Sequence, residues 1–578
     1  MLAATLVFAA AAASIPSGYV DDVSCGSCHA KVVQSYQEVG MSKSFYRPRQ
    51  SDAIENFDKL PFRHARSGDV MELRWRNGRL VFRRWRIDAS GKPIHLFEQA
   101  VDWILGSGHH ARTYLYQTPN GELYQLPLAW YTQTKEWGMA PGYDRPDHEG
   151  VLRRARVECL FCHNAYADLP KNAVTGYWRN QTFPAQLPEG IGCQRCHGPG
   201  AEHVRKASSG ADDAEVRKAI VNPARLDPAR RNDVCYECHL QPSIAFPGIR
   251  RFGRDINSFR PGEPLPSYVL HLDIKDDEIA PADRFEINHH PYRLEQSRCF
   301  RESGGKLACL SCHDPHKKTA DVKPVCMSCH ANAHRASEDC VSCHMPKHRT
   351  QDVVRVVMTD HRIGIYPNLP ALVSPREERE PIIDDIIVTD SVAPAILPAK
   401  DAELYRVVAA VRAGSTSAAK KLEQLLAVNP STAIEPYFDL ATAQLREKRY
   451  DAVEKTAQLI LSRVPDQPLA IEFLGLARGA EGKRDEAIEL LGKAAKLDPD
   501  RVETQYNLGL EYAARGDKDE AAKAFQRAVA ARPNFIAAWI HLGDVSEGNE
   551  AIAAYERALA IDPGSKRAAD ALARRTVN

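Results

Sequence analysis

Seven copies of one short motif hold most of the reactive side chains of this chain. In each copy two residues separate a pair of cysteines, and a histidine directly follows the second cysteine. In chain order, motifs I to VII are Cys25/Cys28/His29, Cys159/Cys162/His163, Cys193/Cys196/His197, Cys235/Cys238/His239, Cys309/Cys312/His313, Cys326/Cys329/His330 and Cys340/Cys343/His344. This is the attachment signature of c-type haem, whose vinyl groups bond to the two thiols while its iron binds the histidine. Because the copies use 14 of the 15 cysteines, the sequence predicts seven covalent haem c groups and electron chemistry.

Other uses of paired cysteines explain the pattern less well. Zinc knuckles and thioredoxin-like redox sites also contain Cys-x-x-Cys. Neither requires the histidine that follows the second cysteine in all seven copies. A disulfide framework is disfavoured too, because cysteines three residues apart bridge poorly and the chain is long.

An iron that only carries electrons needs a second axial ligand, and the chain has histidines to supply it. Those outside the motifs and before residue 370 are His64, His95, His109, His110, His148, His203, His271, His289, His290, His316, His334, His348 and His361. Two histidine ligands favour a lower reduction potential than a histidine and a methionine. We therefore expect mostly six-coordinate, low-spin iron.

The spacing of the last three motifs predicts close haem packing. They begin at Cys309, Cys326 and Cys340. Segments of 17 and 14 residues cannot separate three macrocycles widely, even when extended. Motifs III and IV are also near one another in the chain, and folding could bring them equally close. Such spacing favours electron hopping from one haem to the next.

The distribution of cysteine and histidine divides the chain into domains. Cysteines end at Cys343, and of the 21 histidines only His541 lies beyond His361. This break places a heptahaem domain at residues 15–370. A Pro-rich, acidic and apolar stretch at 371–400 reads as a linker, which could dock on the haem domain.

A small β module is predicted inside the haem domain, at about 65–130. Val70–Trp75 and Leu80–Ile87 alternate apolar and polar residues around Asn77-Gly78, a strong hairpin signal. Asn120-Gly121 indicates a second hairpin. Elsewhere we expect helices and loops around a core made largely of porphyrin.

From residue 401 to 578 the chain becomes rich in Ala, Leu, Glu and Lys, and it acquires a period. Ala441, Gly475, Gly509 and Gly543 follow one another at intervals of 34 residues. Around Gly509 the unit also has Leu508, Tyr512, Ala521, Phe525, Ala528 and Pro533. This is the tetratricopeptide (TPR) pattern of two packed helices per repeat. The unit at 432–465 is degenerate, and 401–430 looks like a partial cap. The sequence therefore predicts a mainly α fold that ends in an α-solenoid of TPR helix pairs.

Charge and the N-terminus suggest where the protein works. The net charge of +1 gives no bias toward nucleic acid. Residues 1–14 resemble the apolar part and cleavage zone of a secretory signal peptide. Haem c is attached outside the cytoplasm, so we expect a periplasmic or extracellular protein. No other stretch is apolar enough for a membrane span.

Some of the runs around the motifs resemble a known family. Cys193–His203, Cys309–His316 and Cys340–Lys347 are similar to multihaem cytochromes related to cytochrome c554. Gly106–Leu115 and Thr359–Ile363, with the Cys-His-Met-Pro element, more closely resemble bacterial multihaem cytochromes with a C-terminal TPR array. The resemblance covers nearly the whole chain.

The resemblance implies distal iron ligands at His110, His203, His316 and His361. It makes His64, His271 and His334 further candidates. His109 and His290, each beside another histidine, are more often structural in such proteins. His95, His148 and His348 are expected at the surface or in contact with the side chains that bind iron.

Two sulfur side chains remain. Met41 occupies the place where related cytochromes often have a histidine, so a thioether ligand and an ordinary packed methionine are both open. Cys299 is the one cysteine outside the motifs. It is either a buried free thiol or a group that contacts a nearby haem.

Together these features predict an exported heptahaem cytochrome that transfers electrons, with redox proteins as partners and a TPR domain for partner binding or self-association. A reductase or oxidase of small nitrogen or sulfur species, with one open iron, is one alternative. The chain lacks a Cys-x-x-Cys-Lys motif, the catalytic haem signature of ammonia-forming nitrite reductases, so we expect a carrier rather than an enzyme. A subunit of a polymeric cytochrome filament is the other alternative.

Overall fold

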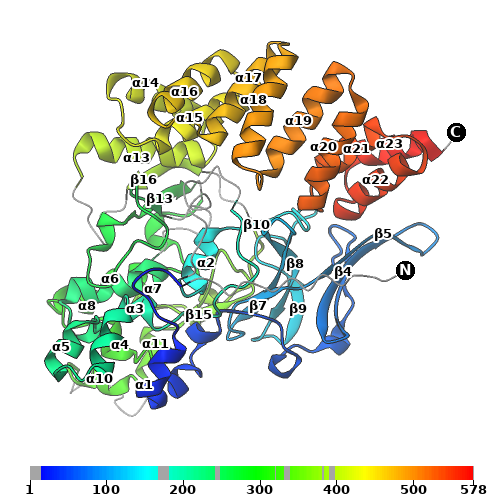
Figure 1. Cartoon of the computed structure of the whole chain (residues 1–578). Helices are drawn as coiled ribbons and strands as arrows, with labels where there is room; N and C mark the ends of the chain where they lie inside the picture. Colours follow the sequence, from blue (N-terminus) through cyan, green and yellow to red (C-terminus); the bar gives the residue numbers. More distant parts are fainter. Residues whose placement is uncertain are drawn as a thin grey trace.

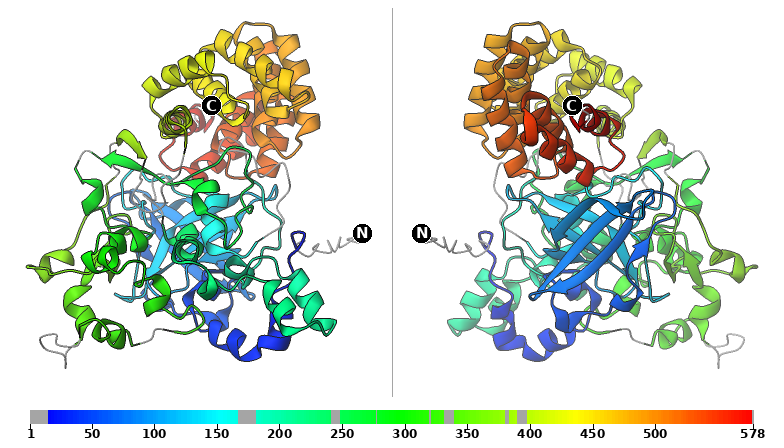
Figure 2. Two further views of the ribbon diagram at one scale, coloured as in Figure 1. Left: turned by 90° about the vertical axis from the view of Figure 1, so that its left-hand side faces the viewer. Right: turned by 90° about the vertical axis from the view of Figure 1, so that its right-hand side faces the viewer.

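The fold is known from a computed structural model, which describes residues 15–166, 181–240, 248–276, 278–318, 321–330, 339–379, 383–388 and 397–576. Three parts follow one another along the chain (Figure 1). After an N-terminal helix that contains the first motif, a β-rich module comes first, then a region of short helices that holds most motifs, and finally an array of helices that arches over both. Two side views show this array stacked on the other parts (Figure 2). The predicted signal segment at 1–14 and His334 lie outside the described residues.

The predicted hairpin at Asn77-Gly78 is present. It joins strands β3 (Val70–Arg76) and β4 (Arg79–Ile87), which pair antiparallel. Asn77 and Gly78 have φ angles of 50° and 76°, as a two-residue turn that matches strand twist requires. Strands β2 (Phe62–Arg63) and β5 (Pro93–Ala100) complete a four-stranded sheet in the order β2-β3-β4-β5.

A second antiparallel sheet packs against this one. Its order is β1-β6-β7-β8-β10, with β9 also paired to β8. Its strands are β1 (Phe45–Tyr46), β6 (Trp103–Leu105), β7 (Ala111–Gln117), β8 (Leu123–Tyr131), β9 (Glu136–Met139) and β10 (Arg154–Ala155). The hairpin predicted at Asn120-Gly121 is the one between β7 and β8. The strands extend beyond residues 65–130 because β1 and β10 are two residues long and show no alternation in the sequence.

The motif region is built from short helices and loops. Its α-helices are α1 (Val23–Tyr36), α2 (Val157–His163), α3 (Gln194–His197), α4 (Ala201–Ser208), α5 (Asp213–Lys218), α6 (Pro228–His239), α7 (His290–Glu295), α8 (Arg298–Glu302), α9 (Cys309–Cys312), α10 (Lys323–Met327), α11 (Cys340–His344) and α12 (Leu369–Leu372). Short paired strands connect them: β11 (Ile249–Arg250) with β12 (Val269–Leu270), and β14 (Lys347–Arg349) with β15 (Val357–Thr359).

The segment predicted as a linker contributes a strand to this region. Within it, β16 (Ile383–Val388) pairs antiparallel with β13 (Leu272–Asp276). Ile386 is buried in a core that also contains Leu272 and Tyr405. Backbone pairing therefore fixes this part of the chain to the motif region.

The C-terminal array consists of tetratricopeptide helix pairs. Its helices are α13 (Ala399–Arg412), α14 (Thr416–Val428), α15 (Glu435–Arg446), α16 (Tyr450–Arg463), α17 (Pro468–Ala480), α18 (Arg484–Leu497), α19 (Val502–Arg515), α20 (Lys518–Ala531), α21 (Ile536–Val545), α22 (Gly548–Ile561) and α23 (Lys566–Thr576). A Cβ on Gly509 would lie 2.5 Å from the Phe525 ring, and one on Gly543 would lie 2.6 Å from the Tyr555 ring. Glycine thus lets the two helices of a repeat approach.

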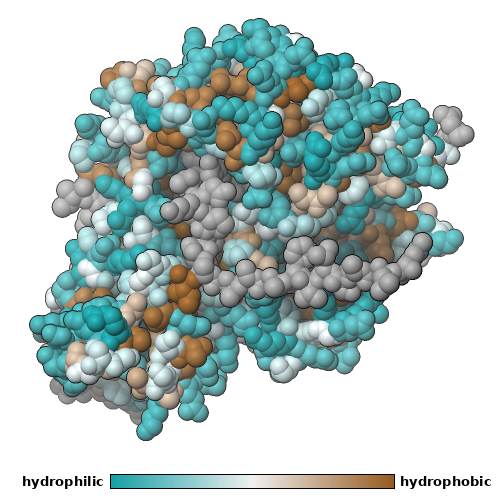
Figure 3. Space-filling view, in the orientation of Figure 1, coloured by the Kyte–Doolittle hydropathy of each residue, from teal (hydrophilic) through white to brown (hydrophobic). Residues whose placement is uncertain are grey.

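Hydrophilic and apolar side chains are unevenly distributed over the surface. Hydrophilic side chains dominate the face shown in Figure 3, while apolar ones gather between the helices of the array and in the recess beneath it. No described helix is both long and apolar enough to cross a bilayer.

The array is joined to the rest of the molecule by buried contacts at both of its ends. Near its start, the Tyr405 ring stacks on Phe252 at 4.2 Å between centroids. Near its end, Ile561 enters the core of the β module. Arg84 of β4, almost fully buried, donates hydrogen bonds to the carbonyls of Ala560 and Ile561. Array and β module therefore share one core.

An ion-pair cluster lies at the same junction. Glu122, which is 0% exposed, accepts hydrogen bonds of 2.5 and 2.8 Å from Arg532 of the array. Arg154 lies 3.2 Å from Glu122 and 3.0 Å from Glu503. Burial raises the pKa of Glu503, but Arg532 and Arg501 outweigh it and hold this pKa well below its usual range. Each of these side chains has a partner of opposite charge.

Arg532→Ala should therefore destabilise the protein. The change leaves Glu122 buried with Arg154 as its remaining cation, and breaking a buried pair costs about 3 kcal/mol. Chemical denaturation followed by tryptophan fluorescence measures this loss. Arg527→Ala is the matched control, because Arg527 lies on α20, just before Arg532, and donates a hydrogen bond to Gln505 at the surface. Equal effects of the two changes would contradict a structural role for the cluster.

Candidate functional site

Each described motif lies on or beside a helical turn. Motif I is inside α1, motif IV ends α6, and the other motifs lie on α2, α3, α9, α10 and α11 or at their ends. On a helix, residues separated by three or four positions share a face. The two thiols and the imidazole of a motif can thus point toward one flat ligand.

Four motif histidines face a histidine from outside the motifs. The ring centroids are 6.3 Å apart for His29 and His203, 5.9 Å for His197 and His316, 6.0 Å for His239 and His290, and 6.2 Å for His313 and His361. The ring planes are nearly parallel, with angles of 14° to 28°. Half of such a separation equals a metal–imidazole bond of about 2.0 Å plus the distance from ring nitrogen to ring centre. One metal ion between two imidazoles fits each pair.

Backbone carbonyls orient several of these rings. The Nδ1 atoms of His163, His197 and His344 lie 3.3, 2.8 and 2.9 Å from the carbonyl oxygens of Ser44, Val221 and Gly364, respectively. Among the facing histidines, Nδ1 of His203 lies 2.8 Å from the Val216 carbonyl, and Nδ1 of His361 lies 3.1 Å from that of Thr359. A carbonyl can only accept, so Nδ1 has the proton and Nε2 keeps its lone pair for a metal.

Burial favours the neutral form of several motif and facing imidazoles. It lowers the pKa of His163 and His361 to about 4, and the hydrogen bond of each to a backbone carbonyl offsets part of that effect. Burial also lowers the pKa of His197, His239 and His313. Neutral imidazole is the form that binds metal.

Thiols of different motifs lie next to one another. Cys25 contacts Cys193, Cys162 contacts Cys238, Cys235 contacts Cys309, and Cys326 contacts Cys340. Cys196 is an electrostatic neighbour of Cys238, and Cys312 of Cys326. These contacts give the spatial order I–III–IV–V–VI–VII, with motif II beside motif IV. Motifs close in space are thus not always close in the chain.

The second thiols of motifs I, VI and VII differ in exposure from the thiols that contact one another across motifs. Cys28, Cys329 and Cys343 are exposed. They belong to α1 and α11 or follow the end of α10, and these three helices bury none of their residues. The core made largely of porphyrin stays a prediction.

Each of these exposed thiols has a serine directly before it in the chain. The Ser27 hydroxyl donates to Cys28 Sγ at 3.8 Å, and the Ser328 hydroxyl donates to Cys329 Sγ at 3.9 Å. Exposure leaves a thiol open to covalent modification. The assignment of Cys28 and Cys329 as haem attachment points thus stays a prediction that rests on the motif and not on burial.

A buried ion pair joins three motifs. Arg195 of motif III lies 3.4 Å from Glu237 of motif IV, and both side chains are 2% exposed. The Arg195 guanidinium also donates to the Phe161 carbonyl in motif II and lies 4.2 Å from the centre of the Phe161 ring. The variable residues inside the motifs thus fix the motifs relative to one another.

Zinc coordination finds little support in this arrangement. Within the part of the chain that the structure describes, one group of three potential metal ligands comes together, namely Asp22, Cys25 and Cys193, within 4.8 Å. A structural zinc site needs four ligands, usually from two cysteine pairs.

Two of the predicted ligands have contacts other than with a motif histidine. Both ring nitrogens of His64 have partners, Ser67 at 2.8 Å and Asp144 at 3.2 Å, so His64 is left out of the ligands that we propose. Met41 was considered for the first motif, but the ring that faces His29 is His203. The Met41 carbonyl accepts hydrogen bonds from the backbone of Ser44 and Ile191, so Met41 helps to position Ser44 beside His163.

Two other candidates, His110 and His271, have no ring paired with a motif histidine at about 6 Å among the described contacts. His110 lies in the loop before β7, and burial lowers its pKa to about 4. His271 is buried and hydrogen bonded to the backbone of Leu240, next to motif IV. His334 lies outside the described residues.

The sequence alone missed His290, which faces His239. It belongs to the doublet His289-His290, and neither spacing nor composition tells which ring points inward. In the structure His289 lies 3.3 Å from the Arg284 carbonyl, while the ring of His290 is also 4.4 Å from that of His361. Cys299 is an electrostatic neighbour of Cys312 and Cys326, so the odd thiol lies beside motifs V and VI.

Comparison with known proteins identifies the C-terminal part. The tetratricopeptide repeat family model matches residues 474–534. Among solved structures, TTC0263, a thermophilic TPR protein of Thermus thermophilus, is 22% identical over 31% of this chain and 100% of its own, with a TM-score of 0.27. A MamA protein is 21% identical over 28% of this chain and 92% of its own, with a TM-score of 0.25. YrrB, a TPR protein with an unusual peptide-binding site, is 18% identical over 27% of this chain and 81% of its own, with a TM-score of 0.23. No curated protein matches this chain. The family model and the helix pairs together show that the C-terminal region consists of tetratricopeptide repeats.

Proposed function

We propose that the protein is an exported electron-transfer protein with seven covalent haem c groups. The observation that carries this proposal is the set of four facing imidazole pairs, each with one histidine from a Cys-x-x-Cys-His motif. A haem fixed by two thioethers and two imidazoles is six-coordinate. When bound, such a haem accepts and releases one electron without binding a substrate.

The proposed ligand sets follow from the geometry. His29 with His203, His197 with His316, His239 with His290, and His313 with His361 would bind the irons of motifs I, III, IV and V. His163, His330 and His344 would bind those of motifs II, VI and VII. His110, His271 and His334 remain the candidates opposite them.

The protein side chains position the cofactors in this proposal. The neighbouring thiols place attachment sites side by side in the order I–III–IV–V–VI–VII. Arg195 and Glu237 fix motifs II, III and IV together, and the carbonyls of Ser44, Val221 and Gly364 set the orientation of three motif rings. Motifs I and VII are the ends of this path, and motif II is a branch.

The TPR array adds protein binding to this function. Tetratricopeptide repeats stack into extended surfaces that bind other proteins. We therefore propose that the array binds a redox partner or a second copy of the chain. Its buried contacts with the β module would keep the bound protein at a fixed distance from the motifs.

Mass spectrometry tests the central claim. The purified protein should exceed its polypeptide mass by seven haems, because seven complete motifs are present. Fewer haems, or zinc in their place, would overturn the proposal.

Removing a facing histidine should leave one iron without its sixth ligand. His203→Ala and His316→Ala should each convert one low-spin haem to high spin, measured by electron paramagnetic resonance, with the haem count unchanged. His109→Ala is the control, since this side chain is exposed and faces no motif histidine among the described contacts. A resting protein dominated by high-spin iron would favour the oxidoreductase alternative instead.

Glu295 should make the redox behaviour depend on pH. Its carboxylate accepts a 2.7 Å hydrogen bond from Tyr236 and is an electrostatic neighbour of Cys309. Burial raises its pKa to about 7. Glu295 is neutral below this pH and negative above it, and negative charge stabilises ferric haem. At least one midpoint potential should therefore fall between about pH 6 and 8, and Glu295→Gln should remove this fall.

Redox titration at several pH values measures the effect. Glu302→Gln is the matched control, because Glu302 is an exposed carboxylate near Glu295 in the chain. A fall that persists in Glu295→Gln would assign the pH dependence to another group.

A further inference from the structure

The segments around motif VII form one continuous surface, which we call the motif VII surface. It consists of α11, strand β14, the loop at 361–366 and α12. Nδ1 of His344 lies 2.9 Å from the Gly364 carbonyl, and the Gly364 N–H donates to the His344 carbonyl at 3.0 Å. Helix α12 packs against β14. Helix α11 lies at the end of the molecule away from the array (Figure 1), so this surface is distinct from the TPR repeats.

No exposed carboxylate lies between residues 340 and 376, the part of the chain that forms this surface. The two acidic residues of this part are engaged by the protein. Asp360 is 0% exposed and belongs to a buried ion pair, and Asp352 accepts a backbone N–H at 3.1 Å. The next exposed carboxylates along the chain are Asp339, which caps α11, and Glu377. Negative charge is therefore confined to the borders of the surface.

Three cations on the motif VII surface have no acidic partner among the residues that the structure describes. They are Lys347, Arg362 and Arg376, and all three are exposed. The Lys347 ammonium donates to the Thr359 hydroxyl at 3.1 Å. Burial lowers the pKa of Arg349, and the nearby charge of Arg376 adds to this effect, as expected where like charges gather. Such a group of cations attracts a negatively charged surface.

An apolar side chain lies among these cations. Ile365 is 91% exposed, more than any other large apolar side chain in the described part of the chain. It directly follows Gly364, whose carbonyl orients the motif ring of His344. Leu369, at the start of α12, is 37% exposed, and Cys343 of motif VII is exposed as well. An apolar centre inside a polar rim is the usual layout of a protein interface, and this one lies directly beside a motif.

The other end of the proposed electron path has a different charge pattern. Near motif I the exposed charges at residues 21–43 are of both signs, with Asp21 and Glu38 beside Lys31 and Lys43. A mixed surface of this kind steers neither an acidic nor a basic partner strongly. The two ends of the path can thus be told apart by a charged partner, and an acidic one is attracted to motif VII.

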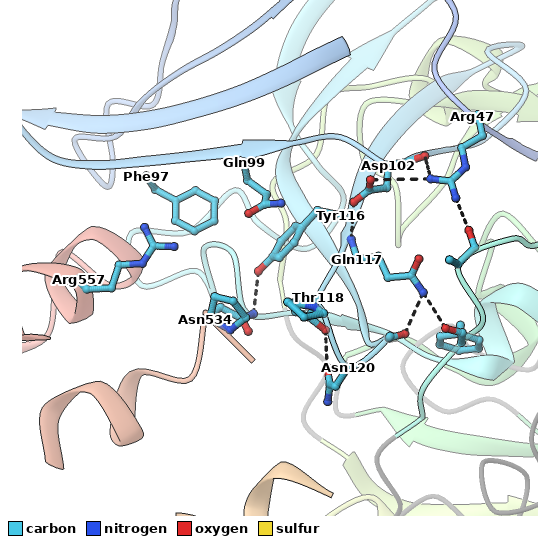
Figure 4. Close-up of a pocket in the computed structure, with 15 residues that line it drawn as sticks. Arg47, Phe97, Gln99, Asp102, Tyr116, Gln117, Thr118, Asn120, Asn534 and Arg557 are labelled. Carbon is cyan, nitrogen blue, oxygen red and sulfur yellow. Dashed lines mark hydrogen bonds and ion pairs between the residues drawn. The ribbon is translucent and has the colours of Figure 1, made fainter. Parts of the chain in front are cut away.

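The cavity between the array and the β module also differs from this surface. Its volume is about 510 Å³, and its polar groups bond to one another (Figure 4). Arg47 lies 3.8 Å from Asp102, and Asn534 donates to the Tyr116 hydroxyl at 2.7 Å. These groups connect parts of the molecule with each other, whereas the cations beside motif VII point to a partner outside it.

We propose that the motif VII surface docks a small electron-transfer protein whose own surface is acidic. This proposal rests on the electron-transfer function proposed above and names the partner and its place. Lys347, Arg362 and Arg376 steer the partner, and Ile365 packs against it. Few charges and a small apolar centre suit a short-lived complex, as repeated electron transfer requires. The array, at the opposite end, remains free to bind a different surface.

Reduction by flavodoxin, a small acidic flavoprotein, tests this surface in the full haem-loaded protein. Each encounter moves one electron, so the reduced flavin is oxidised and one ferric iron of the protein is reduced. The second-order rate constant from stopped-flow absorbance should fall about tenfold between about 10 and 300 mM salt, because salt screens the attraction. Reduced riboflavin, which has no protein surface, should react with little dependence on salt.

The two probes also separate this proposal from the function on which it rests. A flavodoxin rate that does not change with salt, with normal reduction by riboflavin, would overturn the docking surface alone. If riboflavin too fails to reduce the protein, the electron-transfer function itself is wrong, and the docking surface is wrong with it.

Variants locate the docking surface. Lys347→Gln combined with Arg376→Gln should slow the flavodoxin reaction about tenfold at low salt and flatten its salt dependence, with the riboflavin rate unchanged. Ile365→Ser should slow the flavodoxin reaction about threefold at every salt concentration, because it removes apolar contact and no charge. Lys31→Gln is the matched control, since Lys31 is an exposed lysine beside motif I.

Two results would overturn the assignment. Equal slowing by Lys31→Gln would move docking to the motif I end or to the overall charge of the protein. Self-association that the Lys347 and Arg376 changes abolish, with an unchanged flavodoxin rate, would make a second copy of the chain the occupant of this surface.

Discussion

Facing imidazoles are the constraint on which the N-terminal region depends. A motif ring and its opposite ring must meet although they are far apart in the chain, as His29 and His203 are. Carbonyls of Val216, Val221 and Thr359 accept the Nδ1 protons that set ring orientation. In a long helix or a central strand these carbonyls would already be hydrogen bonded. The region is therefore made of short helices with irregular connections, which leave carbonyls available.

Buried charge pairs then fix how the parts fit together. Arg195 and Glu237 join motifs that are distant in the chain, and Arg532 and Glu122 join the array to the β module. Such pairs add little net stability, because both charges lose their hydration, but a mismatched partner is costly. They specify one arrangement of the segments. The same contacts bring Arg557 against Phe97 and create the cavity between the two parts.

Local signals in the sequence predicted the local features well. The Asn77-Gly78 turn and the 34-residue period each depend on residues near one another in the chain, and both structures are present. Contacts over long separations have no such signal. Thus the sequence did not distinguish His290 from His289, or show that residues 383–388 form a strand with β13. The histidines at 203, 316 and 361 were proposed from resemblance, since no periodicity links them to the rings that they face.

The β module cannot be completed until residues 560 and 561 have been made. Arg84 binds carbonyls at residues 560 and 561, and Ile561 belongs to the same core. A polypeptide is synthesised from its N-terminus, and early domains usually fold first. Here all seven cysteine motifs precede the residues that close the module. Closure of the module therefore waits for the last repeats of the array.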